Sequence, residues 1–486
     1  MIQREKIVKS FGWKLLERCS SQAISLLVTI ILARVILPHD FGVIALIIVF
    51  IDIANVIIDG GLNTALIQKK NTDETDYSTI LYFSMGMATV LYLLLFFLSP
   101  LIARFYDNSF LTPIFRVLGV ILFFNSFNSI QRAYVAKNML FDRLFYCSLG
   151  ATIISGATGI VLAFNGYGVW ALVMQQIVFQ ITLTIIMWFT IQWRPHLIFS
   201  ISRFQKLFDF GWKVLVTNLI ISFYENVRSL VIGKLYSPAT LAFFDRGKQM
   251  PGLIMLNINS SLQAILLPAF SDIQDERSRV KQMMKRSIEL TNFCILPILV
   301  GIIVTAEELV TILLTDKWLE AVPFIQIFCI AFMLMPIQSS NMSAIKALGY
   351  SGITLKTEMI KKGLETIILI VSFMIGIYAV AWGIVLYNLI CIVINLYPCK
   401  KILNYGIAEQ IRDVLPYVVL SAIMGGIVYA ISLAGCPIWL TLNLQIIVGL
   451  TVYLMLNAVF RTSCFVYIKD IVSKRIQERR NIIIKQ

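Results

Sequence analysis

The sequence predicts an all-α integral membrane protein with about fourteen transmembrane helices, arranged as two six-helix lobes around a central cavity plus two C-terminal helices. Three observations support this fold class. The 486 residues are 58% hydrophobic and only 14% charged. Apolar runs of about 20 residues or more, long enough to cross a bilayer, recur along the chain. The motif FGWK occurs at the start of two of these runs, which indicates an internal duplication.

Short loops separate the apolar runs, and their charges alternate in character. One set of loops is rich in Lys and Arg, whereas the other is poor in charge. Because cytoplasmic loops carry the excess of Lys and Arg, we expect an inner membrane protein with both termini in the cytoplasm. The expected spans are 11–37, 41–66, 78–103, 112–137, 143–164, 166–192, 208–234, 239–268, 284–305, 318–346, 354–378, 380–402, 413–434 and 438–461.

The duplication divides the chain into its predicted domains. Phe11–Lys14 recurs as Phe210–Lys213, about 200 residues later, and Pro38 corresponds to Pro238. Each copy holds an even number of spans, so both copies enter the membrane in the same direction. The expected domains are an N-lobe (1–200), a C-lobe (201–405), accessory helices (406–465) and a basic cytoplasmic tail (466–486).

Polar residues recur at helical spacing inside the apolar runs. In 11–37 they fall in one narrow sector, and in 41–66 they follow one another by three or four residues. Since a charge in hydrocarbon is costly, these faces should enclose a hydrophilic cavity. The candidate substrate-binding residues are Arg18, Gln22, Asn55, Asn63, Asn128, Arg132, Tyr224, Arg228, Arg246, Lys248, Asn259 and Gln263, and the candidate coupling carboxylates are Asp52 and Asp59.

The chemistry of these residues suits an anionic, glycosylated substrate. Fixed cations in a low-dielectric cavity favour a phosphorylated group, and Asn, Gln and Tyr can hydrogen-bond sugar hydroxyls. A structural interpretation stays open for every charge, because buried charges usually pair. Arg18, for example, can pair with Glu17, Asp52 or Asp59 and simply hold helices together.

Several other classes of function are excluded or disfavoured. The net charge of +14 does not indicate nucleic-acid binding, because the Lys and Arg residues lie in short loops and the tail. The eight cysteines are scattered without a CxxC motif and the chain has two histidines, so disulfide or metal frameworks are not expected. No loop exceeds about twenty residues, so there is no room for a catalytic domain, and we expect no enzyme activity and no resident cofactor.

Several stretches are similar to a known family. FGWK at Phe11–Lys14, LPHDFGVIAL at Leu37–Leu46, and DGGLNTALIQ at Asp59–Gln68 resemble the polysaccharide transporter family of the multidrug/oligosaccharidyl-lipid/polysaccharide exporter superfamily, which includes MATE-like exporters. Tyr236–Pro238 and Asp245–Gly247 resemble the matching turn of the second lobe. The resemblance is strongest to Wzx-type lipopolysaccharide or exopolysaccharide flippases, in the branch of colanic and teichuronic acid exporters.

The resemblance implies translocation of an undecaprenyl-pyrophosphate-linked oligosaccharide across the inner membrane by alternating access, without covalent chemistry. It also implies coupling to Na⁺ or H⁺, and we expect a monomer that works beside a polysaccharide polymerase and a chain-length regulator. The alternative is a cation-coupled multidrug or metabolite exporter on the same fold. That alternative would favour an acidic or aromatic cavity, without an excess of buried Arg and Lys.

Overall fold

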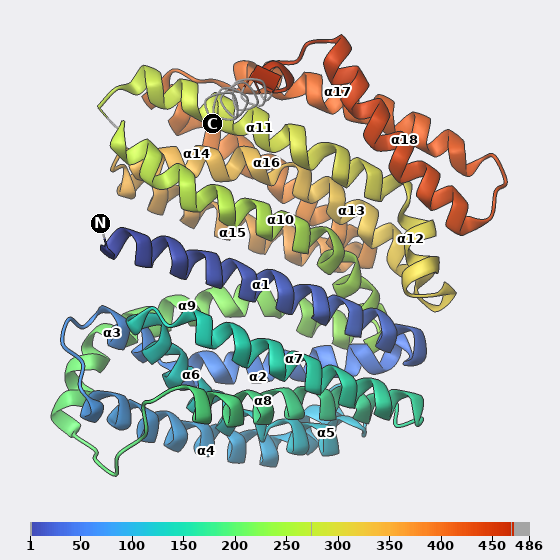
Figure 1. Ribbon diagram of the computed structural model, residues 1–486. Helices are drawn as coiled ribbons and strands as arrows, with labels where there is room; N and C mark the ends of the chain where they lie inside the picture. The colour runs from blue at the N-terminus through green and yellow to red at the C-terminus, as the bar shows by residue number, and fades with distance from the viewer. Residues whose placement is uncertain (1, 274, 468, 471–486) are drawn as a thin grey trace, which may run out of the picture. The chain divides into compact units, whose positions relative to one another are not determined.

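The computed structural model describes residues 2–273, 275–467, 469 and 470, and within them the regular secondary structure is entirely helical. The helices form two compact units, Met1–Ala242 and Phe243–Gln486, and α10 runs from one into the other (Figure 1). Most of the predicted tail, 466–486, lies outside the described residues.

The first unit contains nine helices and the start of a tenth within the described residues. They are α1 (Ile2–Val35), α2 (Pro38–Asp59), α3 (Leu62–Gln68), α4 (Glu74–Phe105), α5 (Leu111–Leu118), α6 (Ile121–Asn138), α7 (Phe141–Phe164), α8 (Val169–Thr190), α9 (Ile201–Leu235) and α10 (Pro238–Asp272).

The second unit continues α10 and adds helices to the end of the described chain. They are α11 (Arg277–Val304), α12 (Ala306–Leu313), the 3₁₀-helix η1 (Asp316–Ala321), α13 (Val322–Met333), α14 (Met335–Ala347), α15 (Ser351–Ile375), α16 (Ile377–Leu403), α17 (Ile407–Ser432) and α18 (Ile438–Val459).

Twelve helical segments of the described residues are long and apolar enough to cross a membrane, which confirms the all-α membrane class. Two of them combine shorter helices, Leu111–Asn138 and Asp316–Ala347. The remaining two predicted spans correspond to α10 and α15, which are 35 and 25 residues long. Both carry several charged side chains, and the count of fourteen stays a prediction.

Helix α9 packs inside the first unit, although the sequence duplication makes it the first helix of the C-lobe. It lies against α2, α3 and α4, whereas α1 lies against α7 (Figure 1). At its N-terminal end, Arg203 forms ion pairs with Asp73 and with Asp76, whose side chain is fully buried. The compact units therefore divide at Ala242, while the lobe boundary at residue 200 and the cavity between the lobes stay predictions.

The second unit is held together by amide side chains as well as apolar packing. Asn341 of α14 and Gln410 of α17 exchange two hydrogen bonds, of 3.0 and 2.9 Å, and both are almost completely buried. Asn388 of α16 donates to the Ala331 carbonyl of α13. Such bonds join helices where apolar surface gives little net drive for association within a bilayer.

Candidate functional site

The second predicted span, 41–66, is broken into two helices at a pair of glycines. α2 ends at Asp59, and Gly60 and Gly61 adopt φ angles of +53° and +67° before α3 begins. Residues with a Cβ rarely adopt this region, which explains glycine at both positions. At Gly61 a Cβ would also lie 2.3 Å from the Gly211 carbonyl oxygen of α9. The break is therefore fixed by conformation and by packing.

Three polar side chains meet directly beside this break. Asn63 of α3 donates from Nδ2 to the Asp59 carboxylate and to the Ser129 hydroxyl of α6. Ser129 also lies 3.5 Å from Asp59 Oδ1, to which its hydroxyl donates. We call Asp59, Asn63 and Ser129 the helix-break cluster. Its carbonyl oxygen Asn63 Oδ1 is buried and has no hydrogen-bond partner among the described residues, so the cluster keeps one free acceptor.

Further amide side chains connect α2, α6 and α8 within the same unit. Asn125 of α6 donates to Asn55 of α2 over 3.1 Å. Asn128 of α6 donates to Gln180 of α8 over 3.2 Å and accepts from Thr184 over 2.9 Å. Together with the helix-break cluster, these contacts place three predicted site residues, Asn55, Asn63 and Asn128, along two contacting helices and α3.

The other predicted residues of the first unit lie on the neighbouring helices. Arg132 is exposed on α6, about one turn beyond Asn128, and Asp52 is exposed on α2, outside the helix-break cluster. The remaining predicted residues of α1 and α9 are half-buried, and each has interactions of its own. They are Arg18, Gln22, Tyr224 and Arg228. Of the two candidate coupling carboxylates, Asp59 alone belongs to the cluster.

Helix α10 carries the predicted residues of the second unit. Arg246 hydrogen-bonds Gln249 and lies over the Trp318 ring, 5.8 Å from its centroid. Lys248 is exposed, and Asn259 is half-buried with a buried Oδ1 that has no hydrogen-bond partner in the described part of the chain. The backbone of Gln263 belongs to α10, but its side chain lies outside the described part of the structure.

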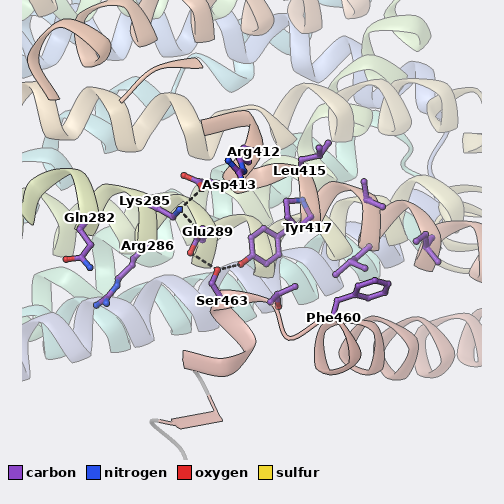
Figure 2. Close-up of a pocket in the computed structure, with 15 residues that line it drawn as sticks. Gln282, Lys285, Arg286, Glu289, Arg412, Asp413, Leu415, Tyr417, Phe460 and Ser463 are labelled. Carbon is purple, nitrogen blue, oxygen red and sulfur yellow. Dashed lines mark hydrogen bonds and ion pairs between the residues drawn. The ribbon is translucent and has the colours of Figure 1, made fainter. Parts of the chain in front are cut away.

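A second site, none of whose residues is among the predicted site residues, lies in the second unit. A pocket of about 730 Å³ is bounded by α11, the start of α17 and the segment after α18 (Figure 2). Its polar side carries Lys285, Arg286, Glu289, Arg412, Asp413, Thr462 and Ser463, and its apolar side carries Leu415, Val419, Leu420, Ile423 and Phe460. These residues come from three distant stretches of the sequence. The sequence signal near them is the change from charged to uncharged residues at the two ends of the run 416–460.

The polar floor of this pocket is held together by ion pairs and hydrogen bonds. Lys285 lies 2.6 Å from Asp413 and 3.8 Å from Glu289, which also accepts a 2.9 Å hydrogen bond from the Ser463 hydroxyl (Figure 2). The Tyr417 hydroxyl is 3.1 Å from that of Ser463. Burial raises the pKa of the adjoining Cys464 thiol to about 11, so this thiol adds no charge at neutral pH.

The fold defines the class of protein. The lipid II flippase MurJ in its inward closed conformation matches with a TM-score of 0.75 and 17% identity, over 93% of this chain and 98% of MurJ. An inward-facing multidrug resistance MATE family transporter of the MOP superfamily matches with a TM-score of 0.60 and 12% identity, over 80% and 98% of the two chains. The protein is a multi-pass membrane protein with this transporter fold.

The sequence comparisons then identify the family. A family model described as polysaccharide biosynthesis protein matches residues 31–323, more than half of the chain, so the chain belongs to this family. The teichuronic acid biosynthesis protein TuaB of Bacillus subtilis (strain 168) is 21% identical, over 78% of this chain and 80% of TuaB. The lipopolysaccharide biosynthesis protein WzxC of Escherichia coli (strain K12) is 22% identical, over 82% of each chain. These matches confirm the resemblance to polysaccharide transporters.

Proposed function

We propose that this protein is a flippase that moves an undecaprenyl-pyrophosphate-linked oligosaccharide across the inner membrane by alternating access, for surface polysaccharide biosynthesis. The helix-break cluster carries this proposal, because Asp59 and its polar partners are half-buried within a helical unit at a discontinuous helix. Discontinuous helices with polar groups at their ends form substrate and ion sites in transporters. Membership of the polysaccharide biosynthesis protein family supports the substrate class.

The transport step needs binding and release of the substrate head group, with no bond made or broken. Arg18, Arg132 and Arg228 supply cations on α1, α6 and α9 that suit a pyrophosphate, since guanidinium groups bind phosphate oxygens in a bidentate manner. The amides of Asn55, Asn63 and Asn128 suit sugar hydroxyls. The lipid tail stays in the bilayer while the head group crosses.

Coupling to H⁺ or Na⁺ at Asp59 supplies the driving force in this proposal. A carboxylate that accepts hydrogen bonds from Asn63 and Ser129 beside an unused amide oxygen offers oxygen ligands of the kind that a small cation prefers. In this proposal both termini lie in the cytoplasm, which the excess of Lys and Arg in alternate loops supports. A polysaccharide polymerase and a chain-length regulator act after the flippase, which works as a monomer.

Deletion of the gene in its own host tests this function. We expect the deletion strain to lose its surface polysaccharide and to accumulate lipid-linked repeat units, with both phenotypes reversed by the wild-type gene. Drug susceptibility serves as the control, because a multidrug exporter on the same fold would change it. Normal surface polysaccharide, together with altered drug susceptibility, would contradict the flippase proposal and support the exporter.

A further inference from the structure

The pocket between α11 and α17 lies where a charged part of the chain meets a long uncharged stretch. From Pro416 to Phe460 the sequence contains no Asp, Glu, Lys or Arg, whereas Arg412, Asp413 and Arg461 flank this stretch directly. An uncharged pair of helices belongs in hydrocarbon, and the first charges on either side mark the boundary with water. Because the pocket is lined from both sides of these limits, it lies at a membrane–water boundary.

The lining of the pocket has one more cation than carboxylates: Lys285, Arg286 and Arg412 against Glu289 and Asp413. Lys285 is matched by Asp413 and Glu289, which also use Tyr405 and Ser463 as hydrogen-bond donors. Arg286 lies over the Tyr467 ring, 5.5 Å from its centroid, and forms no ion pair among the described residues. Arg412 is exposed and likewise has no ion pair in the described part of the chain. The pocket therefore carries an excess of one positive charge, and its two guanidinium groups can donate hydrogen bonds to an anion.

The remaining wall of the pocket is apolar and faces outward. Leu415, Val419 and Ile423, at successive turns of α17, are 52%, 45% and 42% exposed, and Phe460 after α18 is 64% exposed. Tyr417 of the same helix is almost fully buried. The hydrogen bond between its hydroxyl and that of Ser463 holds the polar floor of the pocket in place. A ligand here meets cations at one end and an apolar strip about two turns long at the other.

We propose that this pocket binds an anionic phospholipid of the surrounding bilayer, with the phosphate group held by Arg286 and Arg412 and an acyl chain along α17. The combination of guanidinium groups without an ion pair among the described residues, an exposed apolar strip and a position at the membrane boundary matches the two ends of such a lipid. A volume of about 730 Å³ is within the range of ordinary small-molecule sites. This site is independent of the substrate that the protein carries.

Thermal unfolding of the purified, delipidated protein in detergent tests the proposal. Phosphatidylglycerol should raise the unfolding temperature at concentrations about tenfold lower than phosphatidylcholine with the same acyl chains does. The double variant Arg286→Gln with Arg412→Gln should remove this preference. The matched control, Lys356→Gln with Lys401→Gln, loses two exposed cations of the same unit outside the pocket and should keep it.

Two further measurements separate charge effects from occupancy and identify the lipid. Ile423→Trp fills the apolar strip without changing any charge, and it should weaken phosphatidylglycerol binding even if the arginine variants prove unstable. Farnesyl pyrophosphate, a polyprenyl pyrophosphate, should compete poorly with phosphatidylglycerol. Equal stabilisation by both phospholipids, an unchanged preference in the double and Ile423→Trp variants, or displacement by farnesyl pyrophosphate at lower concentration would each overturn the assignment.

Discussion

Helices α1 and α9 carry the same FGWK motif at the same distance from their starts, yet they contact different surfaces. In α9, Gly211 lies against the glycine break at the end of α2, where an added Cβ would be 3.0 Å from the Gly60 carbonyl oxygen. In α1, an added Cβ at Gly12 would meet no described atom within 4 Å. The glycine of the motif is thus a packing requirement in one copy and not in the other.

The tryptophan of the motif shows the opposite pattern. Trp13 of α1 packs against Phe145 and Tyr146 of α7, with ring centroids 5.5 and 6.0 Å away. Trp212 of α9 is 44% exposed and has the Lys213 ammonium 5.9 Å from its ring centroid. The motif is the same in both copies, but the tryptophan makes the packing contacts in α1 and the glycine makes them in α9. Contacts rather than sequence identity therefore decide which residue matters in each helix.

The largest expected effect comes from the arginines of the two helices, where the two copies should behave alike. Arg18→Ala and Arg228→Ala should each lower polysaccharide export about tenfold, since each removes a charge-assisted contact to the pyrophosphate. The amount of protein in the membrane should stay normal, as measured by immunoblotting of membrane fractions. Arg34→Ala is the control in α1, because this exposed residue lies far from the polar sector. Full export in the Arg18 and Arg228 variants would remove both residues from the substrate route.

Substitution of the glycines should produce the next largest difference. Gly61→Ala combines a positive φ with a clash against the Gly211 carbonyl and should lower the free energy of unfolding by about 2–4 kcal/mol. Gly211→Ala should cost less, because its contacts are longer. Gly12→Ala should have no cost, since alanine favours the helix. Unfolding temperatures of the detergent-solubilised variants measure this order, and a Gly12→Ala effect as large as that of Gly61→Ala would contradict it.

The smallest difference should come from the tryptophans. Trp13→Ala removes two aromatic contacts with α7 and should destabilise the protein by about 1 kcal/mol, whereas Trp212→Ala should change stability by less than about 0.5 kcal/mol. The same thermal measurement applies, with each variant compared with the wild type in one detergent. A larger loss for Trp212→Ala would show that α9, rather than α1, depends on the aromatic residue.

The helical class was predictable because a backbone in hydrocarbon must satisfy its own hydrogen bonds. The break at Gly60–Gly61 was not, because glycine in an apolar run also allows close packing of an unbroken helix. Helical periodicity predicted that Asp52 and Asp59 share one face. It could not predict the contacts with Asn63 of α3 and Ser129 of α6 that make Asp59 part of a cluster. Only the fold shows those contacts.

The pocket of the second unit was beyond sequence reasoning for a different reason. Lys285 and Asp413 are 128 positions apart, and nothing in local spacing indicates that α11 and α17 are neighbours. Conversely, Asn341 is a polar residue within the expected span 318–346, and it is fully buried against Gln410 instead of open to a ligand. An amide in an apolar run indicates either a site or a bond between helices, and its partner decides which.

Transport by purified protein in proteoliposomes tests the central claim most directly. The assay measures transfer of an undecaprenyl-pyrophosphate-linked oligosaccharide between leaflets under a Na⁺ or H⁺ gradient, for the wild type, Asp59→Asn and Asp52→Asn. We expect transfer by the wild type, at least about tenfold slower transfer by Asp59→Asn, and near-normal transfer by Asp52→Asn, because only Asp59 lies in the helix-break cluster. Equal rates for all three proteins, or no transfer by the wild type, would contradict the account.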